Sequence, residues 1–246
     1  MNIKKHIPNL FTLSNLFCGT FAIIFAVNSK FELTAIFVAF GIFFDFFDGF
    51  LARILKVSGE LGKQLDSLAD MVTSGVVPGI VMFYLLANKQ IGIIDFKDNF
   101  FNSSYIPLFG FLITLGACYR LAKFNLDTRQ TESFIGLPTP AMSLFVVFLP
   151  IVQMHTEIDF VKEIISNNYF LLGVTIFLTY LMNAELPLFS LKFNNYGLKE
   201  NRYKYFLILT SIILLLGFKY LAVPIIIIFY VLLSIIKNFR VGIKLS

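Results

Sequence analysis

The sequence predicts an all-α protein, a polytopic membrane helix bundle with about eight transmembrane helices. The prediction rests on composition, on the number of long apolar stretches and on the distribution of charge between them. Of the 246 residues, 57% are hydrophobic and 14% are charged, so no polar segment is long enough for a separate soluble domain. A hydrocarbon core of about 30 Å needs roughly 20 apolar residues per helix. We therefore expect a single integral-membrane domain over residues 1–246.

Apolar stretches of about this length follow one another along the whole chain. They lie near residues 8–28, 31–55, 66–87, 105–122, 138–154, 169–190, 204–219 and 221–237. The last two are close enough to form a tight hairpin around residues 219–220. In the third stretch, Gly75, Pro78 and Gly79 should loosen or kink the helix. Residues 155–168 have the apolar spacing of an interfacial helix.

Lysine and arginine residues are distributed unequally between the two sides of this bundle. With the amino terminus inside, 15 of the 20 basic residues fall in cytoplasmic segments, which is the bias expected of cytoplasmic loops. Both termini should then be cytoplasmic, and residues 88–104 should form an outer loop. The net charge of +5 is dispersed over helix ends, so it does not indicate nucleic acid. Cys18 and Cys118 have no metal-like neighbours, which favours a packing role.

Four carboxylates at helical spacing interrupt this apolar chain. Asp45 and Asp48 are three residues apart, and Asp66 and Asp70 are four apart, so each pair shares one helix face. An intramembrane carboxylate costs about 2.5 kcal/mol or more near a helix centre, which favours a functional site. Oxygen ligands without His or Cys suit a hard divalent cation, Mg²⁺ or Mn²⁺, and indicate phosphoryl transfer. The alternative is that these residues cap helices or pair with nearby lysines.

The carboxylates belong to a longer pattern, D-x2-D-G-x2-A-R-x8-G-x3-D-x3-D, which runs from Asp45 to Asp70. It resembles the signature of the CDP-alcohol phosphatidyltransferase family, every position of which is present. The resemblance implies an integral-membrane enzyme that transfers the phosphatidyl group of a CDP-linked lipid to an alcohol at the cytoplasmic face. It also implies two metal ions held by Asp45, Asp48 and Asp66. Asp70 would lie close to these ions as a further ligand and act as the catalytic base.

A second group of residues is expected to line the site for CDP-diacylglycerol. The group consists of Asn9, Thr12, Asn15, Gly49, Ala52, Arg53 and Gly62. The resemblance assigns Gly49, Ala52 and Arg53 to the cytidine diphosphate pocket, and the two glycines allow close approach to the backbone. The three residues of the first helix recur at intervals of three and form a polar strip. This strip either faces the nucleotide, which is favoured because similar residues open the first helix in members of the family, or only bonds neighbouring helices.

Two segments at and after the end of the fourth apolar stretch indicate which alcohol accepts the phosphatidyl group. R-L-A-K-F-N at residues 120–125 and G-L-P-T-P at residues 136–140 resemble a pair of segments found in the serine-using bacterial and archaeal members of the family. The resemblance implies transfer to L-serine, which gives phosphatidylserine and CMP. The predicted acceptor pocket contains Arg120, Lys123, Asn125, Pro138 and Thr139. Glycerol 3-phosphate and inositol phosphate stay open as acceptors, because Arg120, Lys123 and Arg129 could bind a phosphate.

The resemblance also implies a homodimer in a bacterial or archaeal cell membrane. It covers a core of about residues 7–190, followed by a C-terminal helix pair at about 203–237. Glu185 is interpreted as the partner of Lys192 in a structural ion pair rather than as a site residue. An ion-coupled transporter is the alternative from another class. Transporter carboxylates usually lie near the midplane of repeated halves, and no repeat is found in this sequence.

Overall fold

The protein is an α-helical bundle with a small two-stranded sheet. The computed structural model describes residues 6–57, 59–87, 105–127, 133–190, 197–198 and 201–241. The first half contains α1 His6–Val27, α2 Phe31–Leu55, α3 Glu60–Asp70, η2 Met71–Val76, α4 Val77–Leu86, η3 Ile106–Phe111 and α5 Leu112–Leu126. The second half contains β1 Ser133–Ile135, α6 Thr139–His155, α7 Asp159–Ser166, α8 Asn168–Asn183, β2 Pro187–Phe189, α9 Arg202–Phe218, η4 Lys219–Leu221 and α10 Ala222–Val241.

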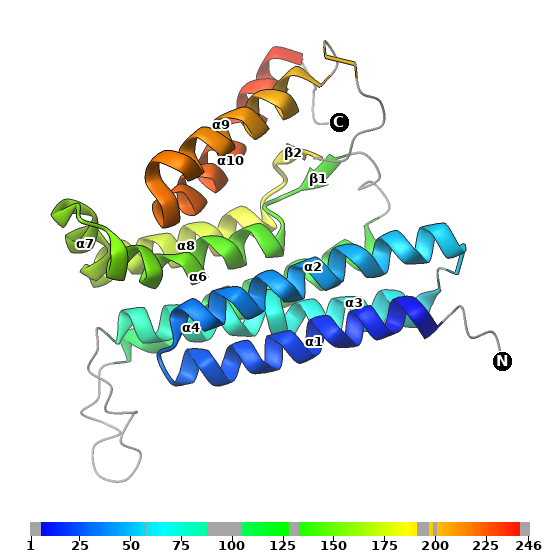
Figure 1. Cartoon of the computed structure of the whole chain (residues 1–246), viewed down its shortest axis with the longest axis horizontal. Coiled ribbons are helices and arrows are strands. Elements are labelled where there is room, and N and C mark those ends of the chain that lie inside the picture. The colour runs from blue at the N-terminus through cyan, green and yellow to red at the C-terminus, as the bar shows by residue number, and fades with distance from the viewer. Residues whose placement is uncertain are drawn as a thin grey trace, which may run out of the picture.

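The helices are arranged in layers (Figure 1). The helices α1, α2 and the continuous α3–η2–α4 helix lie side by side, and α6 and α8 lie beyond them. The α9–α10 hairpin lies on the far side of α6 and α8, inclined to the rest of the bundle. The core between the layers contains fully buried aliphatic side chains, among them Val38, Val81, Met82 and Met142.

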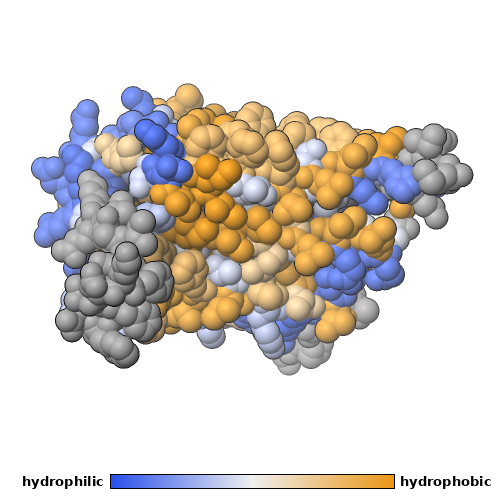
Figure 2. Space-filling view, turned by 90° about the horizontal axis from the view of Figure 1, so that it is seen from below, coloured by the Kyte–Doolittle hydropathy of each residue, from blue (hydrophilic) through white to orange (hydrophobic). Residues whose placement is uncertain are grey.

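Several of these helices are long and apolar enough to cross a membrane. By length and hydropathy, the described residues contain five such stretches, or up to six if the bent pair of α7 and α8 forms one span. The fifth stretch, Arg202–Asn238, contains both helices of the α9–α10 hairpin. Figure 2 shows a broad apolar band with hydrophilic residues gathered toward the two ends of the molecule. These features indicate an integral membrane protein, while the number of eight spans stays a prediction.

The turn between the second and third predicted helices differs from the expectation. The third apolar stretch is predicted near residues 66–87, but α3 already begins at Glu60. The turn lies earlier because Lys56 adopts a left-handed conformation with φ 52°, and its N–H bonds back to the carbonyls of Ala52 and Arg53. Gly59 is extended and precedes the new helix. Gly62 therefore lies in the first turn of α3.

The predicted helix over residues 169–190 is wrong at its end. The helix α8 stops at Asn183, because Ala184 is extended and residues 187–189 form strand β2. This strand pairs antiparallel with β1, with Ser133 opposite Phe189 and Ile135 opposite Pro187. A proline lacks the N–H group that a continuing helix would need. Neither strand is predicted by the sequence pattern.

Three local predictions agree with the structure. The third stretch is loosened over Met71–Val76, where the backbone forms a π-helical segment that contains Gly75 and precedes Pro78. Within residues 155–168, Asp159–Ser166 is helical as α7. The last two stretches form the expected hairpin, which turns at Lys219–Leu221. The predicted outer loop over residues 88–104 lies outside the described part of the chain.

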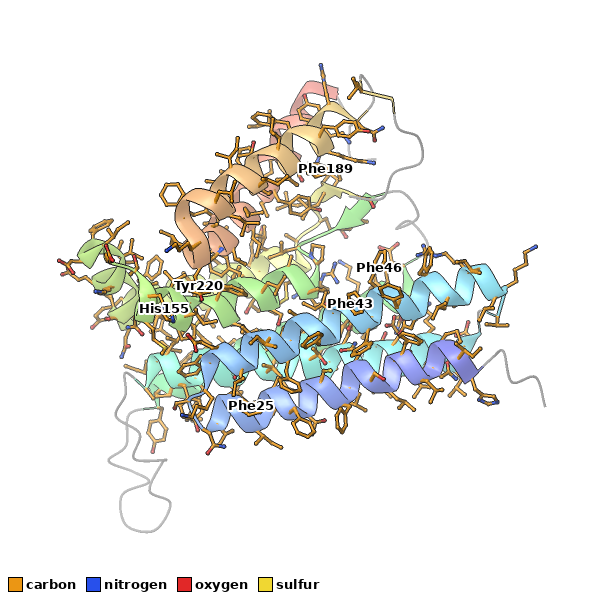
Figure 3. All side chains as sticks on the ribbon, in the orientation of Figure 1. Phe25, Phe43, Phe46, His155, Phe189 and Tyr220 are labelled. Atoms are coloured by element: carbon orange, nitrogen blue, oxygen red, sulfur yellow. The ribbon has the colours of Figure 1, made fainter. Side chains whose placement is uncertain are left out.

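The bundle has two distinct ends. At one end, His155 Nε2 contacts Glu32 Oε1 at 2.5 Å and its ring lies 4.9 Å from that of Tyr220. These contacts join the end of α6 to the start of α2 and to the tip of the α9–α10 hairpin, and Figure 3 labels His155 and Tyr220 at this end. The turn between α2 and α3 lies at the opposite end (Figure 1). The carboxylates near that turn and the His155 contact therefore lie at opposite ends of the bundle.

Candidate active site

Carboxylates from two helices come together where the last turns of α2 face the first turns of α3. One oxygen atom each from Asp45, Asp48 and Asp66 lies within 4.8 Å of the other two. Asp48 is buried, and Asp45 and Asp66 are half-buried. Asp70 lies one turn further along α3 and supplies a separate carboxylate. The antiparallel course of α2 and α3 explains the meeting, because residues near the turn must lie opposite one another.

The oxygen atoms of this cluster fit a divalent cation. Asp66 Oδ1 is buried and has no hydrogen-bond partner among the described residues. A buried carboxylate oxygen without a partner is costly unless a cation or another donor approaches it. The donor set consists of carboxylate oxygens, which suits a hard ion such as Mg²⁺ or Mn²⁺. The cluster of Asp45, Asp48 and Asp66 could therefore bind a metal.

The polar strip of α1 contacts two of the four carboxylates directly. Thr12 Oγ1 donates to Asp48 Oδ2 at 2.5 Å, and Asn15 Nδ2 donates to Asp70 Oδ1 at 3.1 Å. Both donors are buried. Asn9 is half-buried, and its Oδ1 lies 3.5 Å from the position that a Cβ atom on Gly62 would take. Thr12 and Asn15 therefore orient the acidic residues, which is a contact that their spacing alone did not reveal.

A buried threonine on the π-helical segment, which is not among the predicted site residues, holds Asn15 in place. Thr73 Oγ1 donates to the backbone oxygen of Asn15 at 3.2 Å. Two glycines make room for this contact: a Cβ atom would lie 2.4 Å from Thr73 Oγ1 if placed on Gly19 and 2.6 Å from Thr73 Cγ2 if placed on Gly41. The sequence does contain a signal for this packing contact: Thr73 follows Asp70 by three residues, and each of the two preceding helices contains a glycine, Gly19 or Gly41.

Residues of α2 beside the carboxylates line a face with open space. Asp45, Asp48, Gly49, Ala52 and Arg53 recur at intervals that keep them on one side of the helix. A Cβ atom on Gly49 would have no other atom within 4 Å, so space is available directly beside Asp48. Arg53 is exposed near the end of the helix. This face can accept a bulky, negatively charged ligand next to the carboxylate cluster.

The segment at the end of α5 reaches the acidic cluster through Arg120 and Asn125. Arg120 is 7% exposed, interacts electrostatically with Asp70, and has no hydrogen-bond partner at Nε within the described residues. Asn125 Nδ2 donates to Ser67 Oγ at 2.8 Å, and its carbonyl accepts from Lys63 at 2.5 Å. Both contacts join α5 to the acidic helix α3. Within the described residues, this buried guanidinium therefore has an unpartnered Nε.

Lys123 and Glu185 form an ion pair across two segments. Lys123 Nζ lies 3.5 Å from Glu185 Oε1, and both side chains are partly exposed. We expected Glu185 to pair with Lys192, but Lys192 lies outside the described residues. Lys123, which was predicted to line the acceptor pocket, therefore has an acidic partner of its own. An exposed pair of this kind contributes at most about 1 kcal/mol to stability.

Pro138 and Thr139 begin α6 at a crossing with α8. Thr139 is 1% exposed. The amide of Leu137 donates to Leu181 O at 3.0 Å, and the amide of Gly136 donates to Leu186 O at 2.9 Å. Gly136 has a φ of 75°, which favours glycine because a side chain would be strained there. These bonds tie the predicted acceptor segment to α8 and to the residue that precedes β2.

A separate cavity lies far from the carboxylates. It measures about 340 Å³ and is formed by the end of α6 and the turn of the α9–α10 hairpin. Its lining includes His155, Glu157, Lys219 and Tyr220. These residues lie at the end of the bundle opposite the turn between α2 and α3 (Figures 1 and 3). The cavity is therefore distinct from the candidate active site.

Known proteins resemble most of this chain. A sequence profile described as CDP-alcohol phosphatidyltransferase matches residues 5–181. CDP-diacylglycerol–serine O-phosphatidyltransferase of Bacillus subtilis strain 168 is 32% identical over 149 residues, which cover 59% of this chain and 75% of that protein. The protein of the same name from Helicobacter pylori strain J99 is 32% identical over 142 residues, covering 57% of this chain and 55% of the relative.

An archaeal protein is similar at a comparable level. Archaetidylserine synthase of Methanothermobacter thermautotrophicus is 28% identical over 168 residues, which cover 65% of this chain and 66% of that protein. The match to the profile includes all four aspartates and the Arg120 segment. Since the profile covers well over half of the residues, the chain belongs to the CDP-alcohol phosphatidyltransferase family.

Proposed function

We propose that the protein transfers the phosphatidyl group of CDP-diacylglycerol to L-serine, giving phosphatidylserine and CMP. Membership of the family supports the transfer from a CDP-linked lipid. The names of the Bacillus, Helicobacter and archaeal relatives support serine as the acceptor. The observation that carries the proposal is the buried Arg120 guanidinium beside Asp70. The guanidinium would bind the carboxylate of serine, and Asp70 would accept the proton of its hydroxyl.

The chemistry follows from the positions of the acidic residues. Asp45, Asp48 and Asp66 would hold Mg²⁺ or Mn²⁺, which when bound neutralises charge on the pyrophosphate and on the departing CMP. Asp70, oriented by Asn15, accepts the proton of the serine hydroxyl as its oxygen attacks the phosphatidyl phosphorus. A new bond forms between that phosphorus and the serine oxygen. The bond from the same phosphorus to the bridging oxygen breaks, and CMP leaves with the electron pair.

The nucleotide end of the substrate would lie along the open face of α2. The space beside Gly49 admits the cytidine diphosphate close to the helix backbone. Arg53 offers a planar fork of donors to a phosphate or to the base. Ala52 is small enough to leave this face flat, and Gly62 does the same on α3. Thr12 and Asn15 act through the carboxylates, and Asn9 lies beside Gly62 at the edge of the same site.

The contacts of neighbouring cations favour serine over a phosphorylated acceptor. A phosphate carries more negative charge than a carboxylate and calls for several lysines or arginines. Lys123 is already paired with Glu185, and Lys63 bonds to the Asn125 carbonyl. Arg129, the third cation considered for a phosphate, lies outside the described residues. Glycerol 3-phosphate and inositol phosphate are therefore the weaker candidates within the family.

We further propose that the site faces the cytoplasm, with both termini inside and eight helices across the membrane. The basic residues expected outside include Lys30, Lys162 and Lys219, which belong to segments at the His155 end of the bundle. Lys56 and Lys63 belong to the opposite end, beside the acidic cluster. This separation agrees with the excess of basic residues on cytoplasmic segments. A homodimer is the expected assembly in a bacterial or archaeal cell membrane.

The decisive experiment offers the purified protein a choice of acceptors. CDP-diacylglycerol and Mg²⁺ or Mn²⁺ are supplied with serine, glycerol 3-phosphate and inositol phosphate in competition, and the lipid products are identified by mass spectrometry. We expect phosphatidylserine and an equal amount of CMP. The variant Asp70→Asn serves as the matched control for contaminating activity. Formation of a phosphatidylglycerol phosphate or an inositol lipid instead would contradict the assignment of serine.

A further inference from the structure

The C-terminal hairpin makes specific contacts with strand β2. The helices α9 and α10 lie beyond residues 5–181, the part of the chain that matches the family profile. Asn238 Nδ2 donates to the carbonyl of Pro187, and Lys237 Nζ lies 5.2 Å from the centre of the Phe189 ring. Figure 3 shows Phe189 between the hairpin and the rest of the bundle. Both ends of the short strand are therefore held by α10.

Tyr230 makes the most buried of these contacts. Its side chain is 8% exposed, and its hydroxyl donates to the Phe189 carbonyl at 2.9 Å. The rings of Tyr230 and Phe189 meet edge to face, with centres 5.3 Å apart and planes at 73°. Ser234 Oγ donates to the Tyr230 carbonyl at 2.8 Å, one turn along the helix. A tyrosine fixed by a hydrogen bond and by ring packing has little freedom to rotate.

The strand that Tyr230 holds is connected to the predicted acceptor segment. Strand β2 pairs with β1, which leads directly into Gly136 and the start of α6. The amide of Gly136 donates to Leu186 O, one residue before β2. Movement of β2 would therefore shift the backbone that precedes Pro138 and Thr139. The hairpin is linked in this way to one side of the acceptor pocket.

Tyr230 also interacts electrostatically with Arg120, another residue of the predicted pocket. The Arg120 guanidinium interacts electrostatically both with Asp70 and with the Tyr230 hydroxyl. Because the hydroxyl donates its only proton to the Phe189 carbonyl, it can act toward a cation only as an acceptor. Arg120 thus interacts electrostatically with a carboxylate of the catalytic cluster and with a phenol of the C-terminal hairpin. The arginine needs such neighbours, since it is buried and has an unpartnered Nε.

We propose that Tyr230 is a positioning residue for the acceptor, which holds the Arg120 guanidinium and strand β2 in the arrangement that binds the serine carboxylate. The inference rests on the proposed function, because it takes Arg120 as the group that binds serine. It assigns a role to the hairpin, which otherwise only adds apolar surface. Tyr230 contacts no reacting atom and acts through Arg120.

The test is a double-mutant cycle on Tyr230 and Arg120, read from steady-state kinetics with each substrate varied in turn. Tyr230→Phe removes the hydroxyl and keeps the ring. It should raise the serine KM about 3- to 10-fold, the range for loss of one hydrogen bond, with little change in kcat or in the CDP-diacylglycerol KM. In an Arg120→Ala background, the same substitution should change the serine KM by less than about 2-fold.

The controls separate positioning from general damage. Tyr220→Phe removes a hydroxyl from the opposite end of the same hairpin and should leave the kinetics unchanged. Asn238→Ala, which releases the other end of β2, should raise the serine KM in the same direction as Tyr230→Phe. If Arg120→Ala turns over too slowly, Arg120→Lys provides the second background. Thermal unfolding in detergent reports whether each variant is folded.

Each outcome decides the proposal. Equal effects of Tyr230→Phe in both backgrounds, or an effect confined to kcat or to the CDP-diacylglycerol KM, would overturn it. Failure of the unmutated protein to release CMP in response to serine would instead overturn the proposed function. The cycle would then be measured with the acceptor that the protein does use. Coupling of the two residues toward that acceptor would support the positioning role, and additive effects would refute it.

Discussion

Alanine substitutions at two glycines of α2 provide a matched test of the packing that places Asp70. Gly41 and Gly49 belong to the same helix but have different surroundings. A Cβ atom on Gly41 would lie 2.6 Å from Thr73 Cγ2 and 2.8 Å from Asn15 Oδ1, whereas one on Gly49 would have no atom within 4 Å. Gly41→Ala should therefore displace the two side chains that orient the Asp70 segment.

The expected magnitudes follow from these distances. Both substitutions gain up to about 1 kcal/mol of helix propensity. At Gly41, the overlap costs about 1 to 3 kcal/mol, because Thr73 and Asn15 are both fully buried and have little room to move. We expect Gly41→Ala to lower the free energy of unfolding by up to about 2 kcal/mol. Gly49→Ala should raise it by up to about 1 kcal/mol, since nothing opposes the added methyl group.

The assay combines thermal unfolding in detergent with kinetics of CMP release. Gly41→Ala should also lower kcat, because the Asn15 side chain that bonds Asp70 is displaced. Gly49→Ala should leave kcat nearly unchanged and raise the KM for CDP-diacylglycerol, because the methyl group occupies space assigned to the nucleotide. The reasoning would be refuted if Gly41→Ala were as stable and as active as Gly49→Ala.

Three further predictions concern the carboxylates and the topology. Asp45→Asn, Asp48→Asn and Asp66→Asn should each abolish turnover, and each should abolish the rise in unfolding temperature that Mg²⁺ or Mn²⁺ causes in the unmutated protein. A rise that persists in all three variants would contradict a metal site. Asp70→Asn should slow turnover about a hundredfold to ten-thousandfold with an unchanged CDP-diacylglycerol KM, and a kcat near that of the unmutated protein would exclude a general base. Lys63→Cys should react with an impermeant thiol reagent only after the membrane is opened, and labelling in intact cells would reverse the orientation.

Local sequence predicts the helices well because helix formation here depends on neighbouring residues. Long apolar stretches separated by polar segments are sufficient to locate the helices. Helix ends are harder, since they depend on single backbone conformations. The left-handed Lys56 ends α2 without a glycine, and the helix that follows begins earlier than its apolar stretch predicts. Strand β2 is another example, because a three-residue strand forms only where β1 offers its backbone.

The sequence by itself determined which residues share a helix face. The spacing of Asp45 and Asp48, and of Asp66 and Asp70, already predicts two acidic faces and hence a metal-dependent transferase site. Such spacing depends only on the geometry of one helix. The family signature adds the chemistry that these faces perform, since it joins them to the glycines and the arginine of the same pattern.

Only the tertiary structure decided which neighbours those faces meet. Asn15 bonds to Asp70 across 55 positions of the chain, and the Tyr230 hydroxyl reaches Phe189 across 41. Arg120 could have pointed to lipid or water, but the packing of the helices buries it, and it interacts electrostatically with Asp70 and Tyr230. Spacing along one helix does not specify the rotation of that helix against another. That rotation depends on contacts such as Thr73 against Gly19 and Gly41, which exist only once the helices are packed.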